Sequence, residues 1–273
     1  MERVGKALAL ITAVALVTSA VFMQWAWQLH DAHYLQHTAQ DIRLYDRLAK
    51  ALPDYASKKL PDPKEANQVF AKAVDAGAIR NTVDPLFVSI SDAYKGKTDV
   101  VTVDISPIVV PVSASGYHIP PGTVFAQSTI QVGGAAPLLH TMQRLIVPSI
   151  MVTFILLGLL LLISVRGGWL KSLRRLLLYA GIMFMGLFAA SFAIPSVVSV
   201  LANSNALDEA LQAVFVDYIH AIAADAGRYY LALGIICLVV LLALLSMHSI
   251  HHATRRANRK KQVTIKPQEN HEW

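Results

Sequence analysis

Four long runs of apolar residues set the pattern of this chain, and charged residues lie near the ends of each of them. The runs occupy residues 7–29, 145–165, 176–202 and 229–247. A helix needs about 20 apolar residues to cross a hydrocarbon core of about 30 Å. We therefore expect an α-helical integral membrane protein with four transmembrane helices at these positions.

The polar segment after the first run begins with apolar positions at helical spacing. This spacing predicts that the first span continues as an amphipathic helix, which Pro53 ends. Two further helices are expected, over residues 64–76 and from about Val83 to Gly96. The apolar positions of the first helix beyond the span are Leu35, Ile42, Tyr45, Ala49 and Leu52.

The pattern changes to a β type after Gly96. Residues 100–105 are rich in β-branched side chains and residues 123–132 alternate between polar and apolar side chains, so both predict strands. Proline and glycine punctuate the connection between them. Residues 30–143 are therefore expected to form a small α+β domain, and they are numerous enough for a core of their own.

The segment between the third and fourth runs, residues 203–228, predicts one amphipathic helix that is too polar to span a membrane. We expect this helix to pack against the domain of residues 30–143. The alternative is that it lies on the bilayer surface, which suits its acidic polar face less well. Its apolar stripe consists of Leu207, Leu211, Phe215, Tyr218, Ile219 and Ile222.

Composition agrees with a membrane protein. Of the 273 residues, 55% are hydrophobic and only 15% are charged, and the mean hydropathy is +0.46, whereas ordinary soluble domains have about 25% charged residues. The formal net charge is +6, which in a soluble protein would favour nucleic-acid binding. The distribution of the charges argues for a different origin.

Basic residues gather in three segments that a four-span chain places on one side of the membrane. Residues 1–6, 166–175 and 248–273 hold 12 of the 24 Lys and Arg residues but only 3 of the 18 Asp and Glu residues. Such an excess marks cytoplasmic segments. We therefore expect cytoplasmic termini, an extracytoplasmic domain over residues 30–143, location in the cell membrane and no nucleic-acid partner.

The first run follows a basic start, as the core of a cleaved signal peptide would. Its length opposes cleavage, as do Thr18 and Gln24 at the −3 positions of the nearest small-residue exits. Trp25 and Trp27 supply the aromatic collar expected where a span leaves the bilayer. We interpret the run as a retained signal anchor.

Basic side chains beside the spans are expected to contact anionic lipid headgroups. A histidine cluster at residues 248–252 merges into the basic tail, so headgroup contact suits it better than metal binding. The predicted headgroup contacts are Arg166, Lys171, Arg174, Arg175, Arg255, Arg256, Arg259, Lys260 and Lys261.

A candidate metal site consists of His30, His33, His37 and Asp41. On a helix that continues from the first span, steps of three, four and four residues place these side chains near one face. Imidazole and carboxylate groups suit zinc, copper or another divalent first-row metal. The alternative is that these histidines only mark the polar boundary of the membrane.

Enzyme and transporter signatures are missing from the sequence. It lacks HExxH, GxSxG, Walker A and Rossmann glycine motifs, so we expect no catalytic residues and no organic cofactor. The single cysteine, Cys237, lies in an apolar run and is expected to pack as a small hydrophobic side chain. The span interiors carry no charged residues, which argues against ion-coupled transport.

In layout the chain resembles uncharacterised bacterial four-span membrane proteins with an extracytoplasmic α+β domain. The resemblance is carried by residues 92–96, Asp-Ala-Tyr-Lys-Gly, and residues 103–107, Val-Asp-Ile-Ser-Pro, and it implies no activity. The topology alone is also similar to that of permease-like subunits that transmit mechanical force, such as the cell-division protein of the ABC class.

These patterns predict a non-enzymatic integral membrane protein whose extracytoplasmic domain binds or scaffolds a protein partner. The alternative is an accessory subunit of a membrane complex, either a transport or force-transmitting permease or a metal-containing enzyme.

Overall fold

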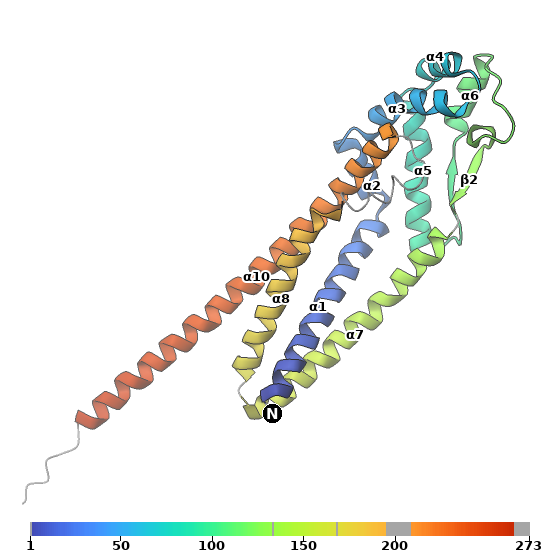
Figure 1. The fold of residues 1–273 in the computed structure, drawn as a ribbon. Helices are drawn as coiled ribbons and strands as arrows, with labels where there is room; N and C mark the ends of the chain where they lie inside the picture. Colours follow the sequence, from blue (N-terminus) through green and yellow to red (C-terminus); the bar gives the residue numbers. More distant parts are fainter. Residues whose placement is uncertain (1, 133, 168, 195–208, 265–273) are drawn as a thin grey trace, which may run out of the picture.

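The computed structural model describes residues 2–132, 134–167, 169–194 and 209–264 (Figure 1). Most of this part of the chain is helical. Four helices are long and apolar enough to cross a membrane, as the four apolar runs predict. The bounds of these four span helices are Glu2–His30 (α1), Ala135–Gly167 (α7), Trp169–Ser191 (α8) and Glu209–Thr264 (α10).

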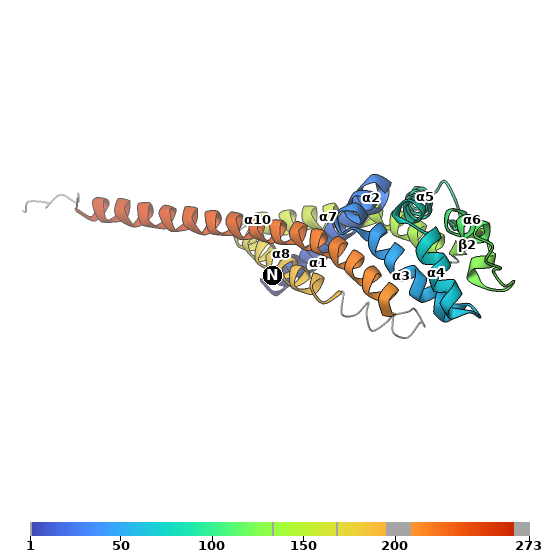
Figure 2. The same ribbon diagram turned by 90° about the horizontal axis from the view of Figure 1, so that it is seen from above.

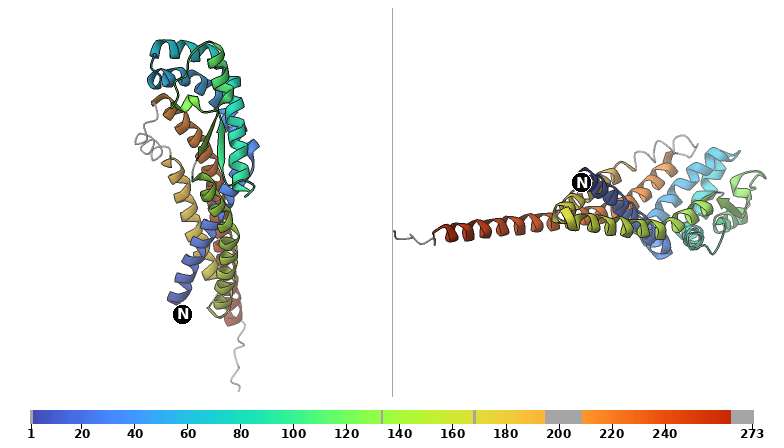
Figure 3. Two further views of the ribbon diagram at one scale, coloured as in Figure 1. Left: turned by 90° about the vertical axis from the view of Figure 1, so that its right-hand side faces the viewer. Right: turned by 90° about the horizontal axis from the view of Figure 1, so that it is seen from below.

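The span helices lie side by side in the order α7, α1, α8, α10 (Figures 1 and 3). Small side chains allow close packing: Ala9 and Ala13 of α1 are fully buried between the helices. A Cβ atom at Gly234 of α10 would lie 3.1 Å from the sulfur of Met185 on α8. Because glycine has no such atom, the two helices can approach closely there.

The outer faces of the span helices are apolar and uncovered by protein. On α7, Phe154 is 68% exposed and Leu162 is 70% exposed. An apolar surface of this extent is unusual on a soluble monomer. It is the surface expected of helices that hydrocarbon surrounds.

The observed span helices are longer than the predicted spans. The basic segment of residues 166–175, expected as a loop, is helical on both sides of residue 168. The predicted helix of residues 203–228 is not separate: from Glu209 onward it is one helix, α10, with the fourth span and the tail as far as Thr264. Residues 195–202 of the predicted third span lie outside the described residues.

Residues 31–132, here termed the head, sit at one end of the bundle (Figures 1 and 2). The head is mostly helical and contains one short sheet. Its elements are α2 (Ala32–Asp41), α3 (Leu44–Lys59), α4 (Pro63–Ala73), α5 (Ala76–Tyr94), β1 (Val101–Asp104), α6 (Ser106–Ala114), the 3-10 turn η1 (Val124–Ala126) and β2 (Thr129–Val132).

Aspartate caps divide the helices of the head. The Asp31 carboxylate accepts a hydrogen bond from the His33 backbone N–H at 2.9 Å and begins α2. Its own backbone is extended, so the first span does not continue into the head as one helix, contrary to the prediction. Asp62 and Asp75 cap α4 and α5 in the same way.

Proline and glycine act differently from the predictions at two positions. Pro53 lies inside α3 and does not end it. Gly77 lies in the first turn of α5, since the Asp75 cap has already separated α4 from α5. In contrast, Gly96 follows α5 with a φ of +73°, a conformation that glycine adopts without strain.

The two strands pair antiparallel, with Val101 opposite Val132 and Asp104 opposite Thr129. The predicted strand over residues 123–132 is therefore reduced to its last four residues. The connection between the strands, expected to be irregular, contains the helix α6. Pro107 lies in the first turn of this helix, where proline is favoured. A single two-stranded sheet accounts for the β character of the head within the described residues.

The core of the head includes the beginning of α10. Phe70 is fully buried there, and its ring meets the ring of Phe125 edge-on at a centroid distance of 4.9 Å. Leu211 and Val214 of α10 belong to the same buried cluster. The prediction that residues 203–228 pack against residues 30–143 is thus confirmed for the described part of that segment.

We expect Phe70→Ala to lower the free energy of unfolding by about 3–5 kcal/mol, because it leaves a cavity in a close-packed core. The effect would be measured as a lower midpoint temperature of thermal unfolding of the purified protein in detergent. Val88 on α5 is 44% exposed, so Val88→Ala is the matched control and should change the transition little. Equal effects of the two changes would contradict the assignment of this core.

Candidate functional site

The four predicted metal ligands, His30, His33, His37 and Asp41, do not form one group in the structure. His30 ends α1, and the turn at Asp31 separates it from the other predicted ligands. Only His37 and Asp41 interact, with 3.0 Å between Nδ1 and Oδ2 on the exposed face of α2. Within the described residues, no three His, Cys, Asp or Glu side chains are grouped so that they could hold a metal ion.

Of the predicted headgroup contacts, the structure describes the side chains of Lys171, Arg174 and Arg175. The side chain of Lys171 is exposed, and that of Arg175 is half-buried and has an interaction partner. Arg174 donates from Nη2 to the backbone oxygen of Leu244 at 2.8 Å and so joins α8 to α10. The side chains of Arg166, Arg255, Arg256, Arg259, Lys260 and Lys261 lie outside the described part of the structure.

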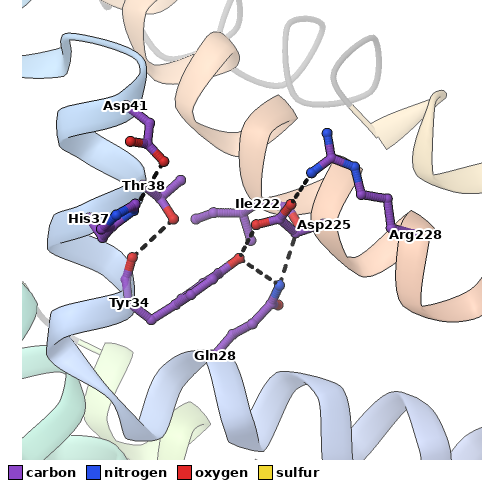
Figure 4. Close-up of polar contacts among 8 residues, drawn as sticks. All are labelled: Gln28, Tyr34, His37, Thr38, Asp41, Ile222, Asp225 and Arg228. Atoms are coloured by element: carbon purple, nitrogen blue, oxygen red, sulfur yellow. Dashed lines mark hydrogen bonds and ion pairs between the residues drawn. The ribbon is translucent and has the colours of Figure 1, made fainter.

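A polar cluster that the sequence analysis did not identify lies where α1, α2 and α10 meet (Figure 4). It consists of Gln28, Tyr34, Asp225 and Arg228 and is here termed the junction. The amide of Gln28 donates to the Tyr34 hydroxyl at 3.0 Å. That hydroxyl donates to the Asp225 carboxylate at 3.0 Å, and Arg228 donates to the other carboxylate oxygen at 3.0 Å.

The junction provides hydrogen-bond partners for the Nε2 group of Gln28 at the boundary between the apolar bundle and the head, whereas the buried Oε1 atom of Gln28 has none among the described residues. Gln28 is 1% exposed, and its amide also donates to the backbone oxygen of Ile222 at 3.4 Å. A buried amide without partners would destabilise the fold. The bonds of Gln28 therefore link the end of α1 to α10.

Further contacts attach α10 to the head beside the junction. The Tyr218 hydroxyl donates to the backbone oxygen of Leu35 on α2 at 3.2 Å. The Tyr218 ring stacks on Phe87 of α5, and Arg47 of α3 forms an ion pair with Asp217. Residues 217–228 of α10 thus contact three helices of the head and the end of α1.

Electrostatics keep the Tyr34 hydroxyl protonated. Burial, followed by the nearby negative charge of Asp225 and the hydrogen bond to it, raises the pKa of Tyr34 to about 12. The neutral phenol is therefore a donor to Asp225 over the physiological pH range. In the same part of the head, burial and the hydrogen bond to Asp84 raise the pKa of Tyr45.

An open cavity of about 630 Å³ borders the junction. It is lined by Met23, Gln24, Trp27, Asp225, Arg228 and Tyr229. An apolar crevice of about 290 Å³ shares Met23 and Tyr229 with it. The crevice extends between the span helices, where its other lining residues are Leu16, Ser19, Ala20, Ile150, Thr153, Phe154, Phe184, Leu233, Ile236 and Cys237.

A second open groove, of about 670 Å³, lies on the head between α6 and the α4–α5 corner. Its lining combines apolar and polar residues. The Asp104 carboxylate, whose pKa is lowered by hydrogen bonds from Ser106, keeps its negative charge at one edge. The lining residues are Ala73, Asp75, Gly77, Ala78, Asn81, Asp104, Ser106, Pro107, Val110 and Pro111.

The sequence carried only a weak signal for the junction. Asp225 and Arg228 stand three residues apart, the spacing of a helical ion pair. Tyr34 and Asp225 are separated by 191 positions, so their contact depends on how α10 packs against α2. Gln24 and Gln28 stand one helical turn apart in an apolar run, which places both amides on one face.

We expect Tyr34→Phe to destabilise the protein by about 1 kcal/mol at neutral pH, since it removes the hydrogen bond to Asp225. The pKa of Tyr34 is higher in the folded chain than its ordinary value of 10.0. Its contribution is therefore complete below pH 10 and is lost as the pH rises to about 12.

Thermal melting of both proteins from pH 7 to pH 12 tests this expectation, because their difference should shrink above pH 10. The control is Tyr55→Phe, since the Tyr55 hydroxyl makes no hydrogen bond to a described residue. A difference that is independent of pH would contradict the proposed role of the Tyr34 hydroxyl.

No protein-family model, no curated protein and no solved structure matches this chain.

Proposed function

We propose that this chain is a non-enzymatic integral membrane protein whose head lies outside the cytoplasm and binds a protein partner there. Four span helices and the distribution of basic residues along the chain support this function. The N-terminal end of α1, the ends of α7 and α8 nearest residue 168, and the C-terminal end of α10 lie at the end of the bundle opposite the head (Figure 1). The basic segments accompany these ends, which supports cytoplasmic termini.

The groove on the head is the observation that carries the partner hypothesis. It opens on the part of the head farthest from the bundle, and Val110 beside it is 62% exposed. Asp75 and Asp104 add negative charge to its rim. Apolar side chains beside two carboxylates suit a protein segment that carries apolar and basic side chains.

Rigid attachment of the head supports a role in holding a partner at a defined orientation. The core of the head contains side chains from α10, and α7 packs its first turns, through Ala136 and Leu139, against Tyr94 and Val101. A partner bound at the head would therefore be fixed relative to the spans as well as to the membrane.

The continuity of α10 favours one alternative, a force-transmitting subunit of a larger complex. Its 56 residues correspond to a length of about 84 Å, well beyond the thickness of a hydrocarbon core. One helix thus connects the head with the far end of the bundle, and a displacement of the head would move that end directly.

The orientation is tested with single cysteines in a Cys237→Ser background. A cysteine at position 95, in place of Lys95, should react with a membrane-impermeant maleimide in intact cells. A cysteine added at the C-terminus should react only after permeabilisation. Labelling of the C-terminal cysteine in intact cells would overturn the proposed orientation.

The partner site is tested by photo-crosslinking in native membranes from position 81 in the groove. We expect one discrete crosslinked product that Val110→Glu abolishes, because a charged carboxylate replaces the apolar contact and would have to lose its hydration when the partner binds. Val88→Glu, an exposed change on α5 away from the groove, should leave the product intact. Identical products with and without Val110→Glu would argue against this site.

A further inference from the structure

The junction cavity and the apolar crevice are neighbours along the bundle and are here together termed the groove. Both are lined by Met23 and Tyr229, so the charged side chains of the junction lie at one end of the groove and the apolar crevice between the span helices lies at the other. Phe154, which is 68% exposed, and Ile236, which is 56% exposed, border the crevice on α7 and α10. The groove is therefore polar at the end near the head and apolar toward the middle of the bundle.

Gln24 presents a mostly buried polar side chain to the junction cavity. It is 6% exposed and lines the junction cavity. Its amide makes no hydrogen bond to a described residue, in contrast to the amide of Gln28 one turn later. Unlike the Oε1 atom of Gln28, the amide atoms of Gln24 are not fully enclosed. They are open to the cavity, where a polar group of a ligand can bond to them.

Asp225 and Arg228 place both signs of charge at the mouth of the cavity. Arg228 is 81% exposed and uses one of its nitrogens for Asp225, which leaves most of its five N–H donors for another anion. The Asp225 carboxylate, 37% exposed, has lone pairs beyond those that accept from Tyr34 and Arg228. The charges of the pair cancel, so a zwitterion complements them better than an anion does.

We propose that this groove binds one phospholipid with a primary ammonium headgroup from the leaflet on the side of the head. An acyl chain fills the apolar crevice and a glycerol ester accepts a hydrogen bond from Gln24. The phosphate binds Arg228 and the ammonium group donates to Asp225. Trp27, 61% exposed beside the cavity, lies at the interfacial depth that tryptophan prefers.

The headgroup class follows from the hydrogen-bonding chemistry. An anionic glycerol headgroup would place its negative charge near Asp225 without a compensating cation. A quaternary choline headgroup carries a positive charge but no N–H group to donate. The inference requires only that the spans cross a bilayer with the head at one surface, so it stands independently of the orientation and of the partner proposed above.

Native mass spectrometry of the full chain in a neutral detergent tests this inference. The probes are dioleoyl phosphatidylethanolamine, phosphatidylcholine and phosphatidylglycerol, each titrated separately. We expect one ethanolamine lipid to bind about tenfold more tightly than either other lipid. Both Gln24→Leu and Arg228→Gln should weaken this binding by about tenfold, the effect of losing one charge-assisted or buried hydrogen bond.

A thermal-shift measurement distinguishes lost binding from lost folding. Gln24→Leu removes an amide that has no hydrogen-bond partner among the described residues. It should therefore keep the melting temperature without lipid and remove the shift that the lipid causes. Arg80→Gln is the matched control, since Arg80 also forms an exposed ion pair on one helix, with Asp84, but does not line the groove. Its lipid binding should equal that of the unmodified chain.

Two results would overturn the inference. Equal affinities for the three lipids would show only annular solvation of the spans. Ethanolamine-lipid binding that survives both Gln24→Leu and Arg228→Gln would place the lipid elsewhere on the protein.

Discussion

The arrangement of this protein depends on the packing of the first turns of α10 into the core of the head. Leu211 and Val214 are part of the buried core of the head, and Tyr218 packs against that core. The core is therefore built from two segments that are far apart in the sequence. The same helix then packs against α8 through the close approach at Gly234. Removing apolar surface from water therefore fixes the head and the fourth span as one unit.

The junction lies at the boundary between the apolar bundle of span helices and the head. Gln28 and Tyr34 come from the two sides of the break at Asp31, and both reach Asp225 or its neighbouring turn on α10. Hydrogen bonds strengthen where water is scarce, so a few polar groups hold α1, α2 and α10 in register. The same arrangement opens a groove between the span helices, with charges only at the end near the head.

The four span helices were predictable because hydrophobic runs are local signals. The four apolar runs became the four span helices, and the helical spacing around Leu35 and Leu52 became helices of the head. The prediction that the first span continues into the head as one helix was wrong, because it depended on a single capping hydrogen bond. The Asp31 cap ends the first helix before the predicted ligands His33 and His37, so the regular spacing of the four residues did not bring them together.

The amino-acid sequence by itself determined the number of apolar helices, the segregation of basic residues and the amphipathic character of the segment before the fourth span. These properties depend on composition and on periodicity within one element. Only the tertiary structure decided that Tyr34 meets Asp225, that Gln24 faces a cavity and that Met23 and Tyr229 line both that cavity and the neighbouring crevice. Such contacts join residues nearly 200 positions apart, and they arise from the packing of whole helices, which no local pattern encodes.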